Sequence, residues 1–163
     1  MVAAYFLDSS AVLKRYLSEV GTAWVLALTA KASGNILLIS RITSVEILSA
    51  TLAVSAKQRA RRQREGSLTS EQTQTLRTIF QQHFTDQYEI VELTPTLTAL
   101  AGELCARQSL RAYDAVQLAS ALTILPIIAQ SPENSLTFLT ADDRLLRAAQ
   151  LEHLQADNPN LHP

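Results

Sequence analysis

Residues 5–16, "YFLDSSAVLKRY", decide the fold class because an apolar run ends abruptly in an acid and a helical pattern follows. Val2 to Leu7 are apolar and predict a short buried strand. The stretch from Ser10 to Glu19 predicts a helix. Two interpretations of Asp8, at the junction, are open. It caps the helix, or it forms one wall of a metal site, with a neighbouring serine as the cap.

The same strand-then-helix pattern repeats along the rest of the chain. Apolar runs predict strands at 36–40, 88–93 and 136–140, and a last short strand at 154–157. Helical patterns are predicted at 22–32, 43–64, 69–84, 94–104, 113–125 and 142–150. The strands are continuous apolar runs, which is typical of a parallel sheet covered on both faces. We therefore expect one α/β domain over residues 1–163, a three-layer α/β/α sandwich around a mostly parallel sheet, with a long helical section around 43–86.

Local signals predict where several helices begin and end. Thr69 and Gln72 form a plausible capping box. Thr94 followed by Pro95 predicts a cap with proline at the first helical position. Pro126 is expected to break or end the helix that contains it.

Composition narrows the class of protein. A net charge of −1 excludes a cationic protein that coats nucleic acid. A single cysteine, Cys105, rules out an internal disulfide, and its apolar helical pattern indicates a buried, unreactive thiol. The most apolar stretch, 115–129, is interrupted by polar residues and proline and is too short to span a membrane. With no recognisable secretory signal, we expect a cytoplasmic protein that does not enter membranes.

One basic segment, "KQRARRQR" at 57–64, contains no acid. A solvated helix end is slightly favoured, because cations are stabilised at a helix C-terminus and Gly66 follows. An arm that contacts RNA phosphates is the second interpretation. Its candidate residues are Lys57, Arg59, Arg61, Arg62 and Arg64.

Acids at four places have unusual neighbours: Asp8, Glu46, Asp114 and the pair Asp142–Asp143. Each alone has a plain alternative as a helix cap, a helix-start acid or a solvent-facing side chain. Together they are expected near the carboxyl edge of the sheet, where α/β proteins bind ligands. Carboxylates gathered there would repel one another and raise each other's pKa. A divalent cation removes that conflict, and all-oxygen ligands favour Mg²⁺ or Mn²⁺.

The histidines do not compete for this role. No two of His83, His153 and His162 have the spacing of metal ligands, and each is expected to be an ordinary surface or packing residue.

The order of the motifs "LDSSAV", "TSVEILSA", "AYDAVQLASAL" and "FLTADDRLLRAA" resembles the PIN-domain family, and most closely its VapC-like ribonuclease toxins of toxin–antitoxin systems. The resemblance covers nearly the whole chain. It implies metal-dependent cleavage of single-stranded RNA, with Mg²⁺ or Mn²⁺ as cofactor. It also implies inhibition by a cognate antitoxin protein and assembly as a homodimer.

By position, Asp8, Glu46, Asp114 and Asp142 match the catalytic acids of that family, and Asp142 fits the fourth position better than Asp143. The resemblance implies that Asp8, Asp114 and Asp142 hold the metal, while Glu46 is a further ligand or orients the attacking water. Ser10 and Thr140 match supporting polar positions. The chain departs from the family at His153-Leu154, where Gly-Leu is common, and 57–84 aligns with nothing catalytic.

Alternatives from other classes stay open. A non-catalytic RNA- or protein-binding module of the same fold is consistent with every structural argument above. A Mg²⁺-binding receiver-type signalling domain needs paired acids after the first strand and a late lysine, whereas this chain has "DSS" and "TAD". A haloacid dehalogenase-type phosphatase needs D-x-D at the first strand, and Ser10 stands at the second acid's place.

Overall fold

The sheet at the centre of the molecule has five parallel strands in the order β3-β2-β1-β4-β5. The computed structural model describes residues 3–51, 69–131 and 133–162. The strands are β1 (Ala3–Leu7), β2 (Ile36–Ser40), β3 (Glu89–Val91), β4 (Ser135–Leu139) and β5 (Ala156–Asp157). The predicted α/β class is confirmed, and the sheet is parallel throughout the described pairings. No helix in the described residues is long and apolar enough to cross a membrane.

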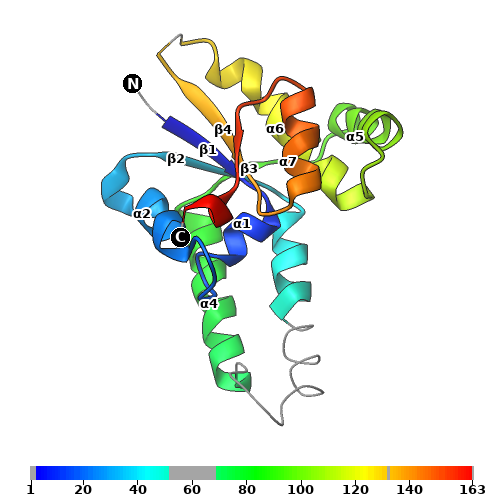
Figure 1. Cartoon of the computed structure of the whole chain (residues 1–163). Helices are drawn as coiled ribbons and strands as arrows, with labels where there is room; N and C mark the ends of the chain where they lie inside the picture. Colours follow the sequence, from blue (N-terminus) through cyan, green and yellow to red (C-terminus); the bar gives the residue numbers. More distant parts are fainter. Residues whose placement is uncertain (1–2, 52–68, 132, 163) are drawn as a thin grey trace.

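Helices cover both faces of the sheet (Figure 1). On one face lie α5 (Pro95–Gln108), α6 (Ala112–Ile128) and α7 (Asp143–Leu151). On the other lie α1 (Ser9–Leu13), α2 (Thr22–Thr29), α4 (Ser70–Asp86) and the helix that begins at residue 43, described as far as 51. Two short 3₁₀ turns, η1 (Lys31–Ser33) and η2 (Pro159–Leu161), complete the described elements.

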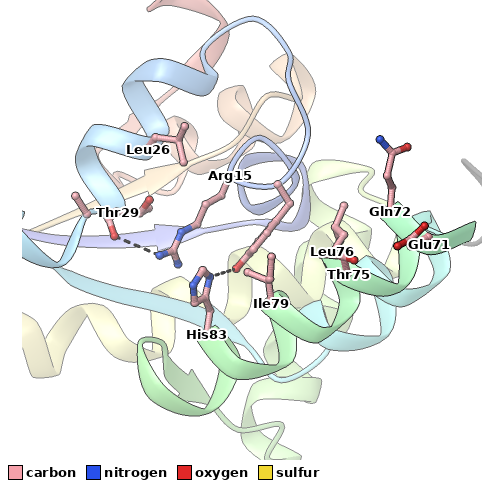
Figure 2. A pocket seen from close by; sticks show the side chains of 11 residues that line it. Arg15, Leu26, Thr29, Glu71, Gln72, Thr75, Leu76, Ile79 and His83 are labelled. Atoms are coloured by element: carbon pink, nitrogen blue, oxygen red, sulfur yellow. Dashed lines mark hydrogen bonds between the residues drawn. The ribbon is translucent and has the colours of Figure 1, made fainter. Parts of the chain in front are cut away.

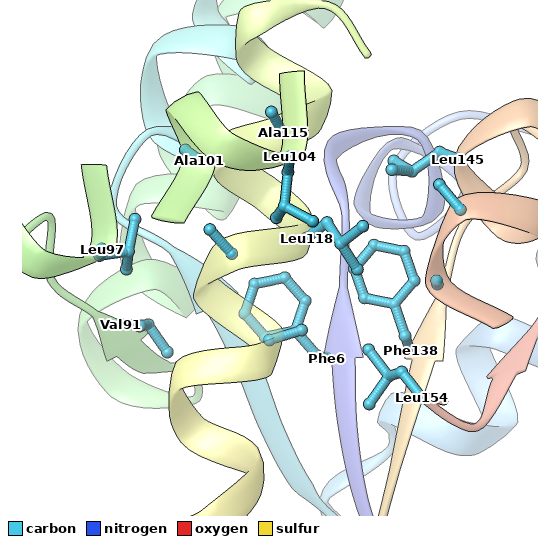
Figure 3. Close-up of a cluster of buried hydrophobic side chains, with 14 of the residues drawn as sticks. Phe6, Val91, Leu97, Ala101, Leu104, Ala115, Leu118, Phe138, Leu145 and Leu154 are labelled. Carbon is cyan, nitrogen blue, oxygen red and sulfur yellow. The ribbon is translucent and has the colours of Figure 1, made fainter. Parts of the chain in front are cut away.

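The two cores follow from the alternation of side chains along the strands. Phe6 enters the first core, where its ring stacks on Phe138 with centroids 5.7 Å apart, and Figure 3 shows both rings beneath Leu104 and Leu118. The next residue, Leu7, points to the opposite core with α1 and α4. Both side chains are fully buried, so the end of β1 is fixed from both faces.

Most expected element boundaries hold within a few residues, and the helix caps are where the sequence predicts them. Thr69 and Gln72 form the reciprocal capping box. The Thr94 side chain accepts from the amide of Leu97, with Pro95 at the first helical position. The basic segment 57–64 lies outside the described residues, as does most of the predicted helix 43–64.

Two helix predictions are wrong. The helix expected over 10–19 ends at Leu13, because the buried ammonium of Lys14 donates to the carbonyl of Val20 at 2.8 Å and holds the chain in a turn. Pro126 does not break its helix, and α6 continues through it to Ile128. At this position proline removes one helical hydrogen bond, the one that an amide of residue 126 would donate to the carbonyl of Leu122.

The turn before β5 contains His153, where the sequence differs from the Gly-Leu pair common in the family that it resembles. His153 has a positive φ of 60°, a left-handed conformation that glycine adopts most easily. The amide of Leu154 still closes the end of α7 by donating to the carbonyl of Ala149 at 3.0 Å. The chain therefore keeps the turn with a residue that is less suited to it.

Candidate active site

The chain order reverses between β1 and β4. From β1 the sheet grows through β2 to β3 on one side and through β4 to β5 on the other. Such a switch point leaves a crevice at the carboxyl ends of the two central strands. Asp8 follows β1 directly, and Thr140 follows β4. The topology thus places two predicted site residues at the position where α/β sheets bind ligands.

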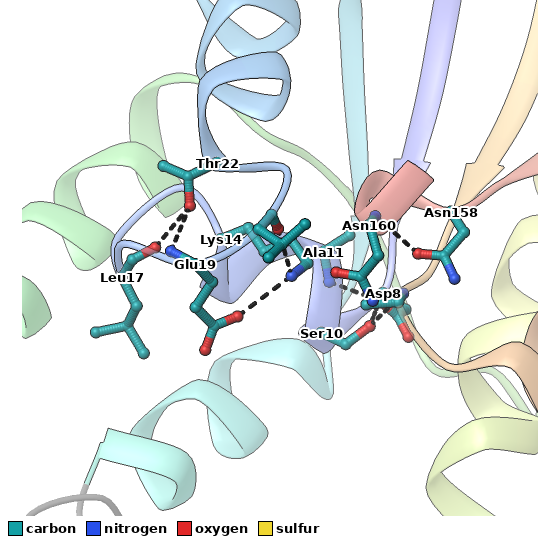
Figure 4. Close-up of polar contacts among 11 residues, drawn as sticks. Asp8, Ser10, Ala11, Lys14, Leu17, Glu19, Thr22, Asn158 and Asn160 are labelled. Carbon is teal, nitrogen blue, oxygen red and sulfur yellow. Dashed lines mark hydrogen bonds and ion pairs between the residues drawn. The ribbon is translucent and has the colours of Figure 1, made fainter. Parts of the chain in front are cut away.

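Asp8 is buried at this edge, and both of its carboxyl oxygens accept hydrogen bonds. Its Oδ1 accepts from the amide of Ala11 at 2.8 Å and from the hydroxyl of Ser10 at 2.7 Å (Figure 4). Its Oδ2 accepts from the hydroxyl of Thr140 at 2.7 Å. Asp8 is therefore the cap of α1, and no serine replaces it as cap. Its part in a metal site stays a prediction.

Ser10 and Thr140 join the ends of β1 and β4. Ser10 Oγ accepts from the amide of Ala141 at 2.8 Å while donating to Asp8. Thr140 Oγ1 accepts from the amide of Asp142 at 3.1 Å while donating to Asp8. Each hydroxyl thus fixes the Asp8 carboxyl and the backbone of the β4–α7 loop at the same time.

Glu46 is held by a second polar group, which the sequence did not reveal. Its Oε2 accepts from Gln117 Nε2 at 2.6 Å and from the hydroxyl of Ser9. The same Gln117 amide nitrogen lies 3.0 Å from Ser9 Oγ and 3.0 Å from Thr43 Oγ1. Gln117 and Thr43 are buried. The available signal was a polar residue three positions after Asp114, on the same face of an otherwise apolar helix.

Asp114 lies in the first turn of α6 and is half-buried. Burial raises its pKa, and the neighbouring charges of Asp142 and Glu46 raise it further. Arg111 and Arg144 oppose this shift. These two arginines are exposed and close enough to affect the acid, although the sequence prediction had looked for basic residues only in the segment 57–64.

Asp142 and Asp143 have different partners. Asp142 is exposed and caps α7, its Oδ1 accepting from the amides of Arg144 at 2.8 Å and Leu145 at 3.0 Å. Asp143 Oδ1 accepts from the side chain of Asn158 at 2.9 Å. The charge of Asp142, and not that of Asp143, is among those that shift the pKa of Asp114. Asp142 is thus the better candidate of the two for the site.

The acids at this edge affect one another electrostatically. Burial raises the pKa of Asp8 to about 6, and the charge of Glu46 adds to the shift. The charge of Glu46 also raises the pKa of Asp114, so Glu46 interacts with both Asp8 and Asp114. In the described residues, no set of three acidic, histidine or cysteine side chains is already arranged around a single metal position. The donors are all oxygens in mutual repulsion, and this chemistry suits a hard divalent cation.

Two cavities on the α1 side of the molecule, of about 610 and 410 Å³, are larger than a third one of about 260 Å³ there. The larger, about 610 Å³, lies between α2, α4 and the turn that follows α1. Leu26 of α2 lies across it from Leu76 and Ile79 of α4, and Arg15 and His83 lie toward one end (Figure 2). The smaller, about 410 Å³, includes Glu46 in its wall.

Fold and acidic edge together define a parallel α/β protein with a carboxylate site at its switch point. The PIN domain model matches residues 5–151, and the chain belongs to the PIN domain family. Comparison with curated proteins gives no significant match.

Solved structures show the same fold at low sequence identity. VapBC2 from Rickettsia felis, bound to a DNA fragment from their promoter, is similar with a TM-score of 0.59 and 19% identity, over 95% of this chain and 98% of that one. VapBC-1 from nontypeable Haemophilus influenzae gives 0.56 and 13%, over 96% and 98%. PAE2754 from Pyrobaculum aerophilum gives 0.54 and 17%, over 99% and 95%.

Proposed function

We propose that this protein is a metal-dependent endoribonuclease that cleaves single-stranded RNA and acts as the toxin of a toxin–antitoxin pair. The observation that carries the proposal is the acidic edge. Asp8, Glu46, Asp114 and Asp142 come from separate segments to one end of the sheet. The charge of Glu46 helps to raise the pKa of Asp8, and the charges of Asp142 and Glu46 help to raise the pKa of Asp114. A surface whose only task is to bind RNA phosphates has no use for such a cluster, because carboxylates repel phosphates.

In the proposed mechanism Asp8, Asp114 and Asp142 hold Mg²⁺ or Mn²⁺. These three carboxylates would bind the ion through oxygen atoms, and the ion would supply positive charge opposite the negative charge that develops on the scissile phosphate. Asp8 is the fixed member, because hydrogen bonds to both of its oxygens set its orientation. Asp114 and Asp142 are more exposed and adjust to the ion.

Glu46 orients the attacking water and accepts its proton as the phosphodiester bond breaks. Ser9 and Gln117 hold one of its oxygens in place, which preorganises the carboxyl group for this task. Ser10 and Thr140 act as positioning residues through Asp8. Arg111 and Arg144, beside Asp114, attract the RNA backbone.

Cleavage assays test the proposal. The protein, purified free of any partner, is incubated with single-stranded RNA, double-stranded RNA or single-stranded DNA, with Mg²⁺, with Mn²⁺ or with EDTA. We expect cleavage of single-stranded RNA that requires the metal and is lost in Asp8→Asn. Cleavage that survives EDTA would contradict the mechanism. Binding of RNA without cleavage would support the non-catalytic module instead.

We further propose that a cognate antitoxin protein inhibits the enzyme in the cytoplasm, where its RNA substrate is found. The larger cavity supports this, since its apolar walls suit the apolar face of a partner helix. Leu26 and Ile79 are 47% and 41% exposed there. Ile79→Asp should release the antitoxin while leaving RNA cleavage intact. The family resemblance also supports a homodimer, which light scattering of the purified protein would detect.

A further inference from the structure

The smaller cavity adjoins the acidic edge and has a mixed lining. It lies between α1, the helix that begins at residue 43 and the first turn of α6. Its lining residues are Ser9, Leu13, Val45, Glu46, Ser49, Ala50 and Tyr113. At about 410 Å³ it falls within the size of small-molecule sites, roughly 300–1,000 Å³. The small side chains of Ser49 and Ala50 leave this space open.

Tyr113 is the unusual member of that lining. It precedes Asp114 in the first turn of α6, yet 49% of its surface is exposed, whereas Ala115 and Leu118 of the same helix are buried. Val45, in the same lining, is 55% exposed. Core packing therefore does not explain the aromatic ring. Two large apolar side chains face solvent beside the acids, where a substrate would lie.

The chemistry of the lining selects one part of an RNA chain. Among the residues that the structure describes, no lysine or arginine lines the cavity, and the carboxylate of Glu46 disfavours a phosphate there. Arg111 and Arg144 lie instead beside Asp114, so the backbone is drawn to that side. A flat, uncharged nucleobase matches the remaining surface, with apolar and aromatic faces for stacking and hydroxyl groups at its edge.

We propose that this cavity is a base subsite in which Tyr113 stacks on an unpaired nucleobase next to the scissile phosphate. The inference rests on the proposed RNA cleavage and adds a residue that contributes to substrate binding. Stacking on aromatic side chains is the usual way in which proteins hold single-stranded bases. Because Tyr113 directly precedes Asp114, a base stacked on its ring would place the adjoining phosphate beside the acids.

Kinetics of Tyr113→Ala and Tyr113→Phe test the role of the ring. Loss of one stacking contact is worth about 1–3 kcal/mol, so Tyr113→Ala should raise KM about 5- to 150-fold. The value of kcat should change little, because stacking binds ground state and transition state alike. Tyr113→Phe should behave as wild type, since the ring remains. Ile127→Ala is the matched control, because Ile127 is exposed near the far end of the same helix.

Substrates with a missing base locate the contact. A cleavable oligonucleotide is prepared with an abasic nucleotide at each position flanking the cleaved bond. With the wild-type protein, an abasic nucleotide at one of these positions should lower the affinity as much as Tyr113→Ala does with the intact substrate. In the Tyr113→Ala variant, removing the same base should cause no further loss of affinity. Equal abasic penalties in both proteins, or an unchanged KM for Tyr113→Ala, would overturn the inference while the proposed ribonuclease activity stands.

Binding separates failure of this inference from failure of the proposed function. In an Asp8→Asn background, a fluorescent single-stranded RNA is titrated with and without Tyr113→Ala, in the presence of Mg²⁺. A loss of affinity on removing the ring supports the subsite even where wild type cleaves nothing. Unchanged affinity overturns the subsite alone, and absence of any RNA binding overturns both proposals.

Discussion

The acidic edge has two halves that differ in how their carboxyl groups are held. Asp8 is buried and Glu46 is partly buried, and hydroxyl and amide groups fix both. Asp114 is half-buried in the first turn of α6, and Asp142 is exposed at the cap of α7. The charges of Arg111 and Arg144 act on Asp114. We infer that the first half sets geometry before substrate arrives, whereas the second half responds to ions and RNA.

The largest expected effect is on the rate of RNA cleavage, when one acid from each half is replaced by its amide. Asp8→Asn should lower kcat by roughly 10³-fold or more, the scale of losing a preorganised electrostatic group. Asp142→Asn should cost less, because asparagine still caps α7 and the exposed position tolerates rearrangement. Rates of RNA cleavage at saturating Mg²⁺ measure both. Equal losses would show that the two halves are equally fixed.

The burial of Asp8 should also make the free energy of unfolding depend on pH. The pKa of Asp8 rises from 3.8 to about 6 on folding, so between these values the folded state holds a proton that the unfolded state releases. The free energy of unfolding of the metal-free protein should therefore fall as pH rises from about 4 to 6. The contribution of Asp8 is at most about 3 kcal/mol.

Urea denaturation in EDTA across this pH range measures the effect. Asp8→Asn should remove most of the slope, and Mg²⁺ should reduce it in wild type by stabilising the charged carboxylate. Identical slopes for wild type and Asp8→Asn would mean that Asp8 is not the group that titrates.

The smallest expected effect separates the positioning residues from the acids. Thr140→Val keeps the shape but removes the hydroxyl that donates to Asp8. Activity should fall about 10- to 100-fold, the usual cost of losing a partner of a metal ligand. Thr140→Ser is the control, because it restores the hydroxyl. The affinity for Mg²⁺, measured by calorimetry, should weaken in Thr140→Val, whereas a purely structural role would lower stability alone.

The sequence predicted what depends on local pattern and missed what depends on distant contacts. Apolar runs located the strands, and Asp8, Ser10 and Thr140 could be placed at strand ends. Gln117 could not be assigned to Glu46, since the two are 71 positions apart and meet only after α6 has packed on the sheet. The short α1 was missed for a similar reason, as a buried lysine holds the following turn.

The hydrogen bond from Thr140 to Asp8 joins residues 132 positions apart, and this has a consequence for synthesis of the protein. The strand that leads to Thr140 is a central strand of the sheet, yet it is made after β1, β2 and β3. A chain released before residue 135 carries Asp8, Glu46 and Asp114 but cannot assemble the site. Such truncated products would lack the proposed active site.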